Sequence, residues 1–206
     1  MKPATRLTPI SPVVHRWSSF HPQWKVDFSS YAVTTSEGVY FVDPLRPRPT
    51  LQQQLAALGA PLGVFLTNAN HERDADWFRK EFDIHVFAHE KAKPECDIKL
   101  DILVLDGEKL PGGPRVLHVP GGGAGESALV VGDIVLLGDA LLHPKGQALA
   151  LLPEQYCEDA KQLARSLRQL LDVDFQTLTF AHGEPIVGQA KAQLAALLKP
   201  SRKKKP

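Results

Sequence analysis

The order of apolar and turn-forming segments constrains the fold more than any other feature of this sequence. Three segments rich in Val, Tyr and Phe, residues 13–20, 26–34 and 39–43, are separated by Pro or Gly and predict consecutive strands. Shorter apolar segments then alternate with helical patterns along the rest of the chain. A cluster of Gly and Pro over residues 106–114 is a concentrated turn signal, and it divides the series into two halves.

The later elements have recognisable boundaries. We predict helices that begin at Thr50 and Asp74, because each is a capping residue that precedes apolar residues at helical spacing. Two further helical patterns begin at Tyr156 and Val187. The remaining apolar segments predict strands at residues 63–67, 84–88, 98–105, 115–119, 128–131, 134–137 and 175–180.

Each half therefore combines a mostly β region with two helices. Packing the apolar faces of the two sheets together leaves the helices outside, so we predict an α+β fold, a four-layer α/β/β/α sandwich. The 206 residues suit a single domain, which we place at residues 1–200 with its halves divided near residues 106–114. Residues 201–206 form a basic C-terminal tail, for which we expect a solvated terminus.

Composition excludes several classes of protein. The 24 Lys and Arg nearly balance the 23 Asp and Glu, giving a net charge of +1, so we expect no nucleic-acid partner. No apolar run reaches the ~18 residues of a membrane span, and no apolar signal core follows the N-terminus, so we expect a cytoplasmic protein without a membrane partner. Cys96 and Cys157 indicate reduced thiols, although the sequence leaves a bridge between them open.

Four polar loops lie at the ends of predicted strands. Such loops are where sheets usually carry their ligands, because a rigid scaffold positions the side chains there. The loops span residues 67–74, 120–127, 138–143 and 181–184.

In order and spacing, these loops resemble the motifs of the metallo-β-lactamase superfamily. That pattern is a strand ending in Thr-His-x-His-x-Asp-His, a Pro-Gly-His-Thr-x-Gly loop, a Gly-Asp pair and a late Gly-His. The matching residues here are Thr67, Pro120-Gly121, Gly138-Asp139 and His182, with Asp43-Pro44 matching an early Asp-Pro of the family. The resemblance covers nearly the whole chain and implies the fold predicted above, with a hydrolase centre of two zinc or iron ions.

The metal-ligand positions of that pattern are largely replaced in this chain. They hold Asn68, Asn70, Glu72, Arg73 and, in the second loop, Gly122. Asn offers only a neutral carbonyl oxygen, which suits hard ions better than zinc, and a fixed guanidinium repels a nearby cation. Asp139 and His182 remain as metal ligands, so the resemblance implies a degraded metal site that holds one divalent ion or none.

His71 and Glu72 leave alternatives open. His71 stands at a variable position of the motif, so it points to solvent, caps the helix start, or turns inward through a shift of the loop. With Glu72, Asp139 and His182, an inward His71 would complete a set of two His and two carboxylates for one ion. Glu72 is otherwise a general base or a negative charge at a helix N-terminus. His143 is a further candidate because it closely follows Asp139.

Two functional hypotheses follow. By its resemblance, the chain is a metal-dependent hydrolase of an ester, thioester, lactone or phosphodiester, with Glu72, His71 and Asp139 as catalytic residues. Alternatively, it is a non-catalytic relative that binds an anionic metabolite through Arg73, which pairs with Asp139 in place of the lost cation. In that alternative Asn68 and Asn70 also contact the ligand. The partner is thus a small-molecule substrate or an anion, and the oligomeric state stays open.

Overall fold

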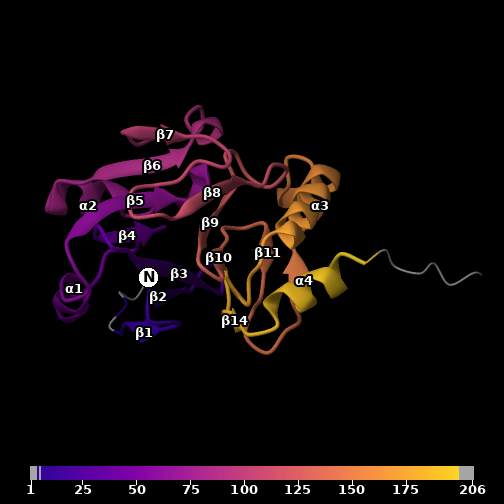
Figure 1. The fold of residues 1–206 in the computed structure, drawn as a ribbon, viewed down its shortest axis with the longest axis horizontal. Coiled ribbons are helices and arrows are strands. Elements are labelled where there is room, and N and C mark those ends of the chain that lie inside the picture. Colours follow the sequence, from indigo (N-terminus) through magenta and orange to yellow (C-terminus); the bar gives the residue numbers. More distant parts are fainter. Residues whose placement is uncertain (1–3, 5, 200–206) are drawn as a thin grey trace, which may run out of the picture.

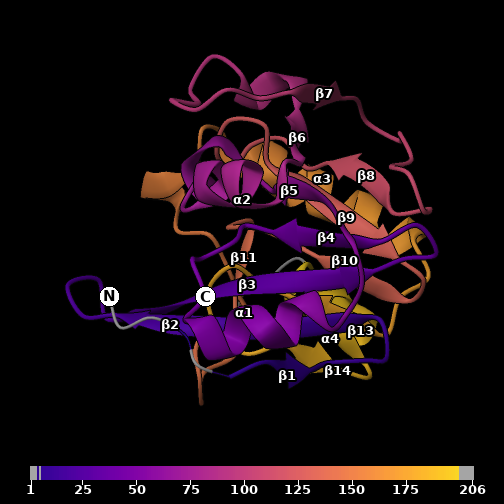
Figure 2. The ribbon, with the colours of Figure 1, turned by 90° about the vertical axis from the view of Figure 1, so that its left-hand side faces the viewer.

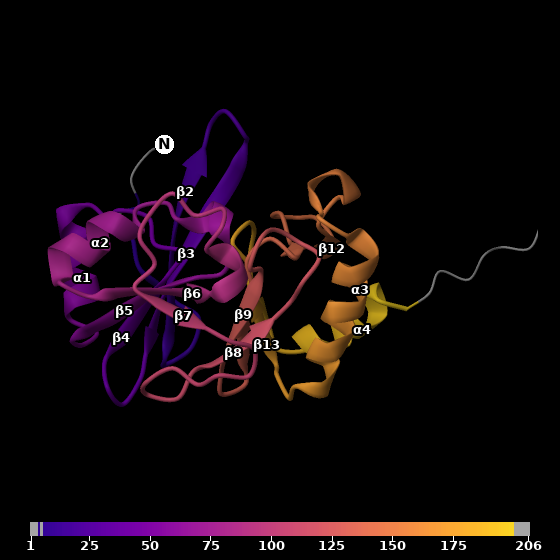
Figure 3. The ribbon, with the colours of Figure 1, turned by 90° about the horizontal axis from the view of Figure 1, so that it is seen from above.

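The structure, a computed structural model, describes residue 4 and residues 6–199. The basic tail at residues 201–206 lies outside the described residues. Two large sheets stack face to face, with one pair of helices on each outer side (Figures 1 and 3). The predicted four-layer α/β/β/α sandwich is therefore confirmed.

The first sheet has seven strands in chain order. The three consecutive strands predicted at the start of the chain correspond to β2, β3 and β4; β1 to β4 pair antiparallel, and β4 to β7 pair parallel. Their bounds are Thr8–Pro9 for β1, Val14–His21 for β2, Val26–Thr34 for β3, Val39–Val42 for β4, Pro61–Leu66 for β5, His85–His89 for β6 and Ile102–Val104 for β7.

The second sheet has five strands in the order β14-β13-β10-β9-β8, and residues 106–114 carry the chain into it from the first sheet. The pair β10 and β13 is parallel, and its neighbours are antiparallel. The bounds are Arg115–His118 for β8, Ser127–Val131 for β9, Ile134–Leu136 for β10, Thr177–Thr179 for β13 and Ile186–Val187 for β14. A separate two-stranded ribbon joins β11 (Leu141–Leu142) to β12 (Ala150–Leu151).

The helices cover the outer faces of the sheets. Figure 2 shows α1 (Pro49–Ala56) and α2 (Ala75–Phe82) lying across the first sheet. On the opposite side of the molecule, α3 (Ala160–Gln169) and α4 (Ala190–Leu197) cover the second sheet (Figure 1). Short 3-10 turns complete the set: η1 (Ala69–His71), η2 (Glu90–Ala92), η3 (Glu154–Tyr156) and η4 (Leu170–Asp172).

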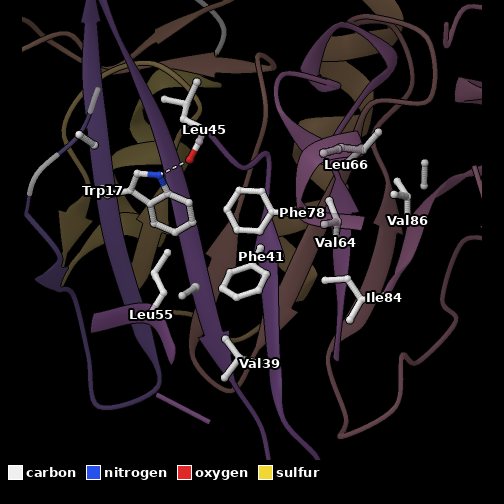
Figure 4. Close-up of a cluster of buried hydrophobic side chains, with 14 of the residues drawn as sticks. Trp17, Val39, Phe41, Leu45, Leu55, Val64, Leu66, Phe78, Ile84 and Val86 are labelled. Atoms are coloured by element: carbon white, nitrogen blue, oxygen red, sulfur yellow. Dashed lines mark hydrogen bonds between the residues drawn. The ribbon is translucent and has the colours of Figure 1, made fainter. Parts of the chain in front are cut away.

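Alternating side chains along the strands divide the core into layers. In β4, Tyr40 and Val42 point into the apolar layer between the two sheets, whereas Phe41 points toward the helices. Phe41 joins Trp17 and Phe78 in the layer beneath α1 and α2, where the Trp17 indole donates to the Leu45 carbonyl at 2.9 Å (Figure 4). A third cluster lies between the second sheet and its helices. A sheet buried on both faces explains why its strands are apolar throughout.

Several predicted boundaries are wrong. The strand predicted at residues 98–105 is limited to β7, and Tyr156 lies in the exposed turn η3 rather than in α3. The cap of α3 is Asp159, whose carboxylate accepts from the Gln162 N–H at 2.9 Å. Asp74 makes no capping bond but accepts from the Arg46 N–H at 2.8 Å, because tertiary contact outweighs the local cap.

The carboxyl ends of β5, β10 and β13 meet at one edge of the sandwich, and the loops that follow them carry the predicted site residues. The β2–β3 hairpin projects beyond the body of the molecule (Figure 3). Among the described residues, no helix is long and apolar enough to cross a bilayer. Cys96 and Cys157 are both free thiols.

Candidate metal centre

Three side chains converge where those loops meet. His71 lies in η1, Asp139 follows β10, and His182 follows β13. The Nε2 atoms of His71 and His182 each lie 3.3 Å from a different carboxylate oxygen of Asp139. One potential ligand atom from each residue fits within 4.8 Å of the others, which is the spacing of a group able to hold a metal ion.

The second nitrogen of each imidazole is held by an acceptor. Nδ1 of His71 lies 3.0 Å from Oδ2 of Asp43 and 2.8 Å from Oγ1 of Thr67. Nδ1 of His182 lies 3.1 Å from the main-chain oxygen of Asp27. Acceptors of this kind favour the tautomer with a proton on Nδ1, which leaves Nε2 as the ligating atom. Both rings are therefore oriented as metal-bound histidines are.

Asp43 is the buried anchor beneath this group. Its carboxylate accepts from the Thr67 N–H at 2.8 Å and from the Thr67 hydroxyl at 2.6 Å, in addition to contacting His71. The Asp43 backbone has a φ of +46°, and Arg73 a φ of +43°, in the left-handed region that non-glycine residues rarely adopt. Both residues therefore have a strained backbone conformation. Strained residues of this kind are common at functional sites.

Charge is balanced within the buried cluster. Burial would lower the pKa of His71, but the carboxylates of Asp139 and Asp43 outweigh it and raise the pKa to about 10. Burial would raise the pKa of Asp139, but His71 and His182 hold it well below its usual range, and His71 and Arg73 likewise lower that of Asp43. Protonated His71 and Arg73 thus offset two carboxylates near neutral pH.

Arg73 does not form the predicted ion pair with Asp139. Its Nη1 donates to the main-chain oxygens of Ser29 and, at 2.8 Å, Asp43, and its guanidinium lies 5.1 Å from the ring centre of Phe28. Its Nε and Nη2 atoms are buried without a hydrogen-bond partner. The bond to the Ser29 carbonyl holds the side chain at β3, so Arg73 contributes charge to the cluster without an ion pair to Asp139.

Glu72 points away from the group. Its Oε1 accepts from the main-chain N–H groups of Asp97 and, at 3.1 Å, Ile98, so it anchors the segment that precedes β7. Of the predicted set of two His and two carboxylates, the structure brings together His71, His182 and Asp139, and Glu72 lies elsewhere. His143 also lies apart, with its Nδ1 2.7 Å from the Glu184 main-chain oxygen and its side chain outside the residues that line the cavity described below.

Asn68 contacts a carboxyl group that sequence reasoning missed. Nδ2 of Asn68 donates to Oε2 of Glu126 at 2.6 Å and lies 3.5 Å from Oδ2 of Asp139. Glu126 is fully buried, and burial, with a further contribution from Asp139, raises its pKa to about 8. The sequence signal that could have identified Glu126 is its position between a glycine-rich loop and an apolar strand.

A cavity of about 950 Å³ opens over the three converging side chains. Its floor contains His71, Asp139 and His182 together with Asn70 and Arg73. One wall comes from the β2–β3 hairpin and the other from the ribbon β11–β12 and the turn η3. The apolar wall residues are Trp24, Val26, Phe28, Leu142, Pro144, Leu152, Pro153 and Tyr156. Polar groups beneath apolar walls are the usual arrangement of a small-molecule site.

Comparisons with known proteins identify the family and the fold. A family model described as the metallo-beta-lactamase superfamily matches residues 8–199. Among curated proteins, none matches the sequence.

Solved structures of the same fold are similar over almost the whole chain. The DIM-1 metallo-beta-lactamase exposed to ceftazidime has a TM-score of 0.77 and 16% identity over 96% of this chain and 97% of its own. The metallo-beta-lactamase from Pontibacter korlensis has a TM-score of 0.74 and 15% identity over 94% and 98%. TTHA1623 in a di-iron-bound form has a TM-score of 0.67 and 22% identity over 87% and 97%. At these identities the likeness concerns the fold.

Proposed function

This chain belongs to the metallo-β-lactamase superfamily, and from that membership we propose that it is a hydrolase that works with one divalent metal ion. The observation that carries the proposal is the convergence of two imidazoles and a carboxylate on the floor of a cavity. Each imidazole has its other nitrogen held by an acceptor. Two His and one carboxylate leave open positions for substrate and water.

The donor set fits one ion and does not fit two. Asp139 Oδ1 is buried and makes no hydrogen bond of regular geometry within the described part of the chain, although Nε2 of His182 lies 3.3 Å from it. Its lone pairs are therefore available to an ion held between the two groups. A second ion would need further imidazoles or carboxylates. The remaining motif positions offer the neutral amides of Asn68 and Asn70 and no side chain at Gly122, while Glu72 faces elsewhere.

A bound divalent ion would supply Lewis acidity toward a carbonyl or phosphoryl oxygen of the substrate. The residues of this chain position it and shape the site. Asp43 and the Asp27 carbonyl keep the two imidazoles in place, and Asp139 lies between them. The apolar walls would bind the rest of the substrate, and the substrate would then shield the centre from water.

The cavity walls favour an uncharged acyl substrate over a phosphodiester. Apart from His, Arg73 is the lining residue with a positive charge; its Nη1 is bonded to carbonyl oxygens, and its Nε and Nη2 have no hydrogen-bond partner among the described residues. A phosphodiester would therefore meet a single guanidinium, whose charge already interacts with Asp43 and Asp139, as compensation for its negative charge. An ester, thioester or lactone with an apolar group would bury that group against Trp24, Phe28 and Tyr156.

Calorimetric titration of chelator-stripped protein with Zn²⁺, Mn²⁺ and Fe²⁺ tests the proposal. We expect one bound equivalent of at least one of these ions. The substitutions His71→Ala, Asp139→Ala and His182→Ala should each weaken binding by more than ~100-fold, because each removes a ligand. Glu72→Gln is the matched control and should leave the affinity unchanged. Hydrolysis of apolar esters should follow the metal and stop with chelator.

Charge balance favours a second candidate, a non-catalytic site for an anionic metabolite that involves Arg73. His71 and Arg73 already offset Asp43 and Asp139, so the cluster is stable without an added cation. The same titration separates the two. Absence of metal binding together with binding of a carboxylate or phosphate compound, lost in Arg73→Met, would support this candidate. Chelator-sensitive ester hydrolysis that Asp139→Ala abolishes would exclude it.

A further inference from the structure

Glu126 is a fully buried carboxyl group that does not face the cavity. Its Oε2 accepts from Nδ2 of Asn68 at 2.6 Å, and its Oε1 accepts from the Ala140 N–H at 3.1 Å. Asn68 follows β5, and Ala140 follows Asp139 in the loop after β10. Glu126 therefore ties together the two segments that carry His71 and Asp139.

The side chain of Glu126 lies in a space that glycines leave open. A Cβ atom at Gly122 would lie 3.2 Å from Cγ of Glu126, and a Cβ atom at Gly138 would lie 2.8 Å from its Oε1. Gly122 stands where the superfamily's loop motif carries a His. A side chain at residue 122 and the Glu126 side chain would compete for one space, and in this chain the carboxyl group has it.

Both donors to Glu126 also border Asp139. Ala140 is the next residue along the chain, and Nδ2 of Asn68 lies 3.5 Å from Oδ2 of Asp139. A buried acceptor without its donors is costly, so the bonds hold these segments firmly. Loss of Glu126 would release the Asp139 loop at two points, one on the main chain and one beside the carboxylate.

We propose that Glu126 is a positioning residue that, through Asn68 and Ala140, holds the Asp139 carboxylate between the imidazoles of His71 and His182. The carboxyl group supports the centre through these two bonds without being a ligand itself. The consequence for metal binding rests on the proposed function above. The placement of Asp139 can be measured without any metal.

The decisive comparison is between Glu126→Gln and Glu126→Ala. Both variants lack the acidic group, so a direct effect of its charge cancels between them. Gln keeps the volume, its oxygen can accept from the Ala140 N–H, and the Asn68 amide can turn its oxygen toward the Gln NH₂ group. Ala removes both contacts. Any difference between the two variants therefore reports the connection itself.

The first readout is the imidazole pKa of His71, followed by NMR in metal-free protein. Asp139 raises this pKa, so a displaced carboxylate should lower it by about one unit in Glu126→Ala relative to Glu126→Gln. A residue that only stabilises the fold would lower the melting temperature of the Ala variant without moving the His71 pKa. Equal His71 pKa values in the two folded variants would overturn the proposal.

The second readout is calorimetric titration with Zn²⁺. Once the proton that His71 releases is accounted for with the measured pKa of each variant, Glu126→Ala should bind Zn²⁺ about 10–100-fold more weakly than Glu126→Gln, the usual cost of losing a group that orients a ligand. Equal affinities after this correction would also overturn the proposal. Wild-type protein that binds no Zn²⁺ would contradict the proposed function, while the NMR comparison would still decide the role of Glu126.

A further variant keeps the test valid if Glu126→Ala does not fold. Asn68→Ala removes one of the two connections and leaves Glu126 bonded to Ala140. It should lower the His71 pKa in the same direction relative to wild type. An unchanged His71 pKa in folded Asn68→Ala would then overturn the proposal.

Discussion

Oδ2 of Asp43 lies 3.0 Å from Nδ1 of His71, and this contact fixes the ring with its Nε2 turned toward Asp139. Asp43 stands at the end of β4 and His71 in the turn after β5, two adjacent parallel strands. The carboxylate both raises the pKa of His71 and selects its tautomer. The orientation of the centre therefore depends on a residue that does not touch the cavity.

Asp43→Asn should weaken metal binding while leaving all three ligands in place. The amide still accepts a hydrogen bond, but it no longer holds the imidazole electrostatically, so we expect the Zn²⁺ affinity, corrected for the lower His71 pKa of the variant, to fall by about 10–100-fold. Calorimetric titration of the variant measures this. Asp27→Asn is the matched control, because Asp27 contacts His182 through its main-chain oxygen. An unchanged affinity in Asp43→Asn would show that the tautomer is set by other groups.

Metal affinity should rise with pH. His71 has a pKa of about 10 and is protonated in the metal-free protein at neutral pH, whereas a ligand imidazole must be neutral. Binding therefore releases a proton, and the apparent affinity should increase about tenfold per pH unit between pH 7 and 9. Calorimetry in two buffers of different ionisation enthalpy counts the proton directly. A pH-independent affinity over this range would mean that His71 is not a ligand.

The layered core was predictable because it depends on patterns between residues that are close in the sequence. Tyr40 and Phe41 are adjacent in β4, so large apolar side chains lie on both faces of this strand. This pattern indicates a sheet that is covered on one face by helices and on the other by a second sheet. The predicted second helix and the glycine-rich divide fall close to the observed α2 and the crossing between sheets for the same reason. These features depend on neighbours in the chain.

The site was only partly predictable because its contacts are long-range. The inward turn of His71 depends on the 3-10 turn η1 and on Asp43, which lies 28 positions earlier. The bond between Asn68 and Glu126 joins residues 58 positions apart. Glu72 has the right chemistry for a ligand but is drawn to the main chain of residues 97 and 98. Motif spacing identifies the loops, whereas tertiary packing decides which side chains meet.

The metal-free protein should lose stability as the pH rises above neutrality. Folding raises the pKa of His71 from 6.5 to about 10, so its contribution to the free energy of unfolding is complete below pH 6.5 and is lost as the pH rises through 10. Glu126, raised from 4.5 to about 8, acts in the same direction at lower pH. The loss should be on the order of a few kcal/mol.

Melting temperatures measured with chelator between pH 6 and 10 follow this loss. His71→Gln should flatten the curve above pH 8, where Glu126 is already ionised in the folded protein. Asp43 and Asp139 have lowered pKa values, so their contribution is lost only as the pH falls below 3.8. A wild-type melting temperature that rises between pH 8 and 10 would contradict the charge balance described here.

Preference for apolar acyl groups should depend on the two exposed aromatic residues at the mouth of the cavity. Trp24 on the β2–β3 hairpin is 62% exposed and Tyr156 in η3 is 65% exposed, and both line the cavity. Exposed aromatic side chains contribute most binding free energy when a substrate covers them, because most apolar area is then removed from water.

In a series of p-nitrophenyl esters, we expect kcat/KM to increase from acetate to octanoate. Trp24→Ala and Tyr156→Ala should each reduce the octanoate value by about tenfold and the acetate value much less, because each removes about 1–2 kcal/mol of apolar contact. Val187→Ala is the matched control, since Val187 is 65% exposed but lies outside the cavity. Equal losses on both esters would assign these aromatic residues to the fold instead of to substrate selection.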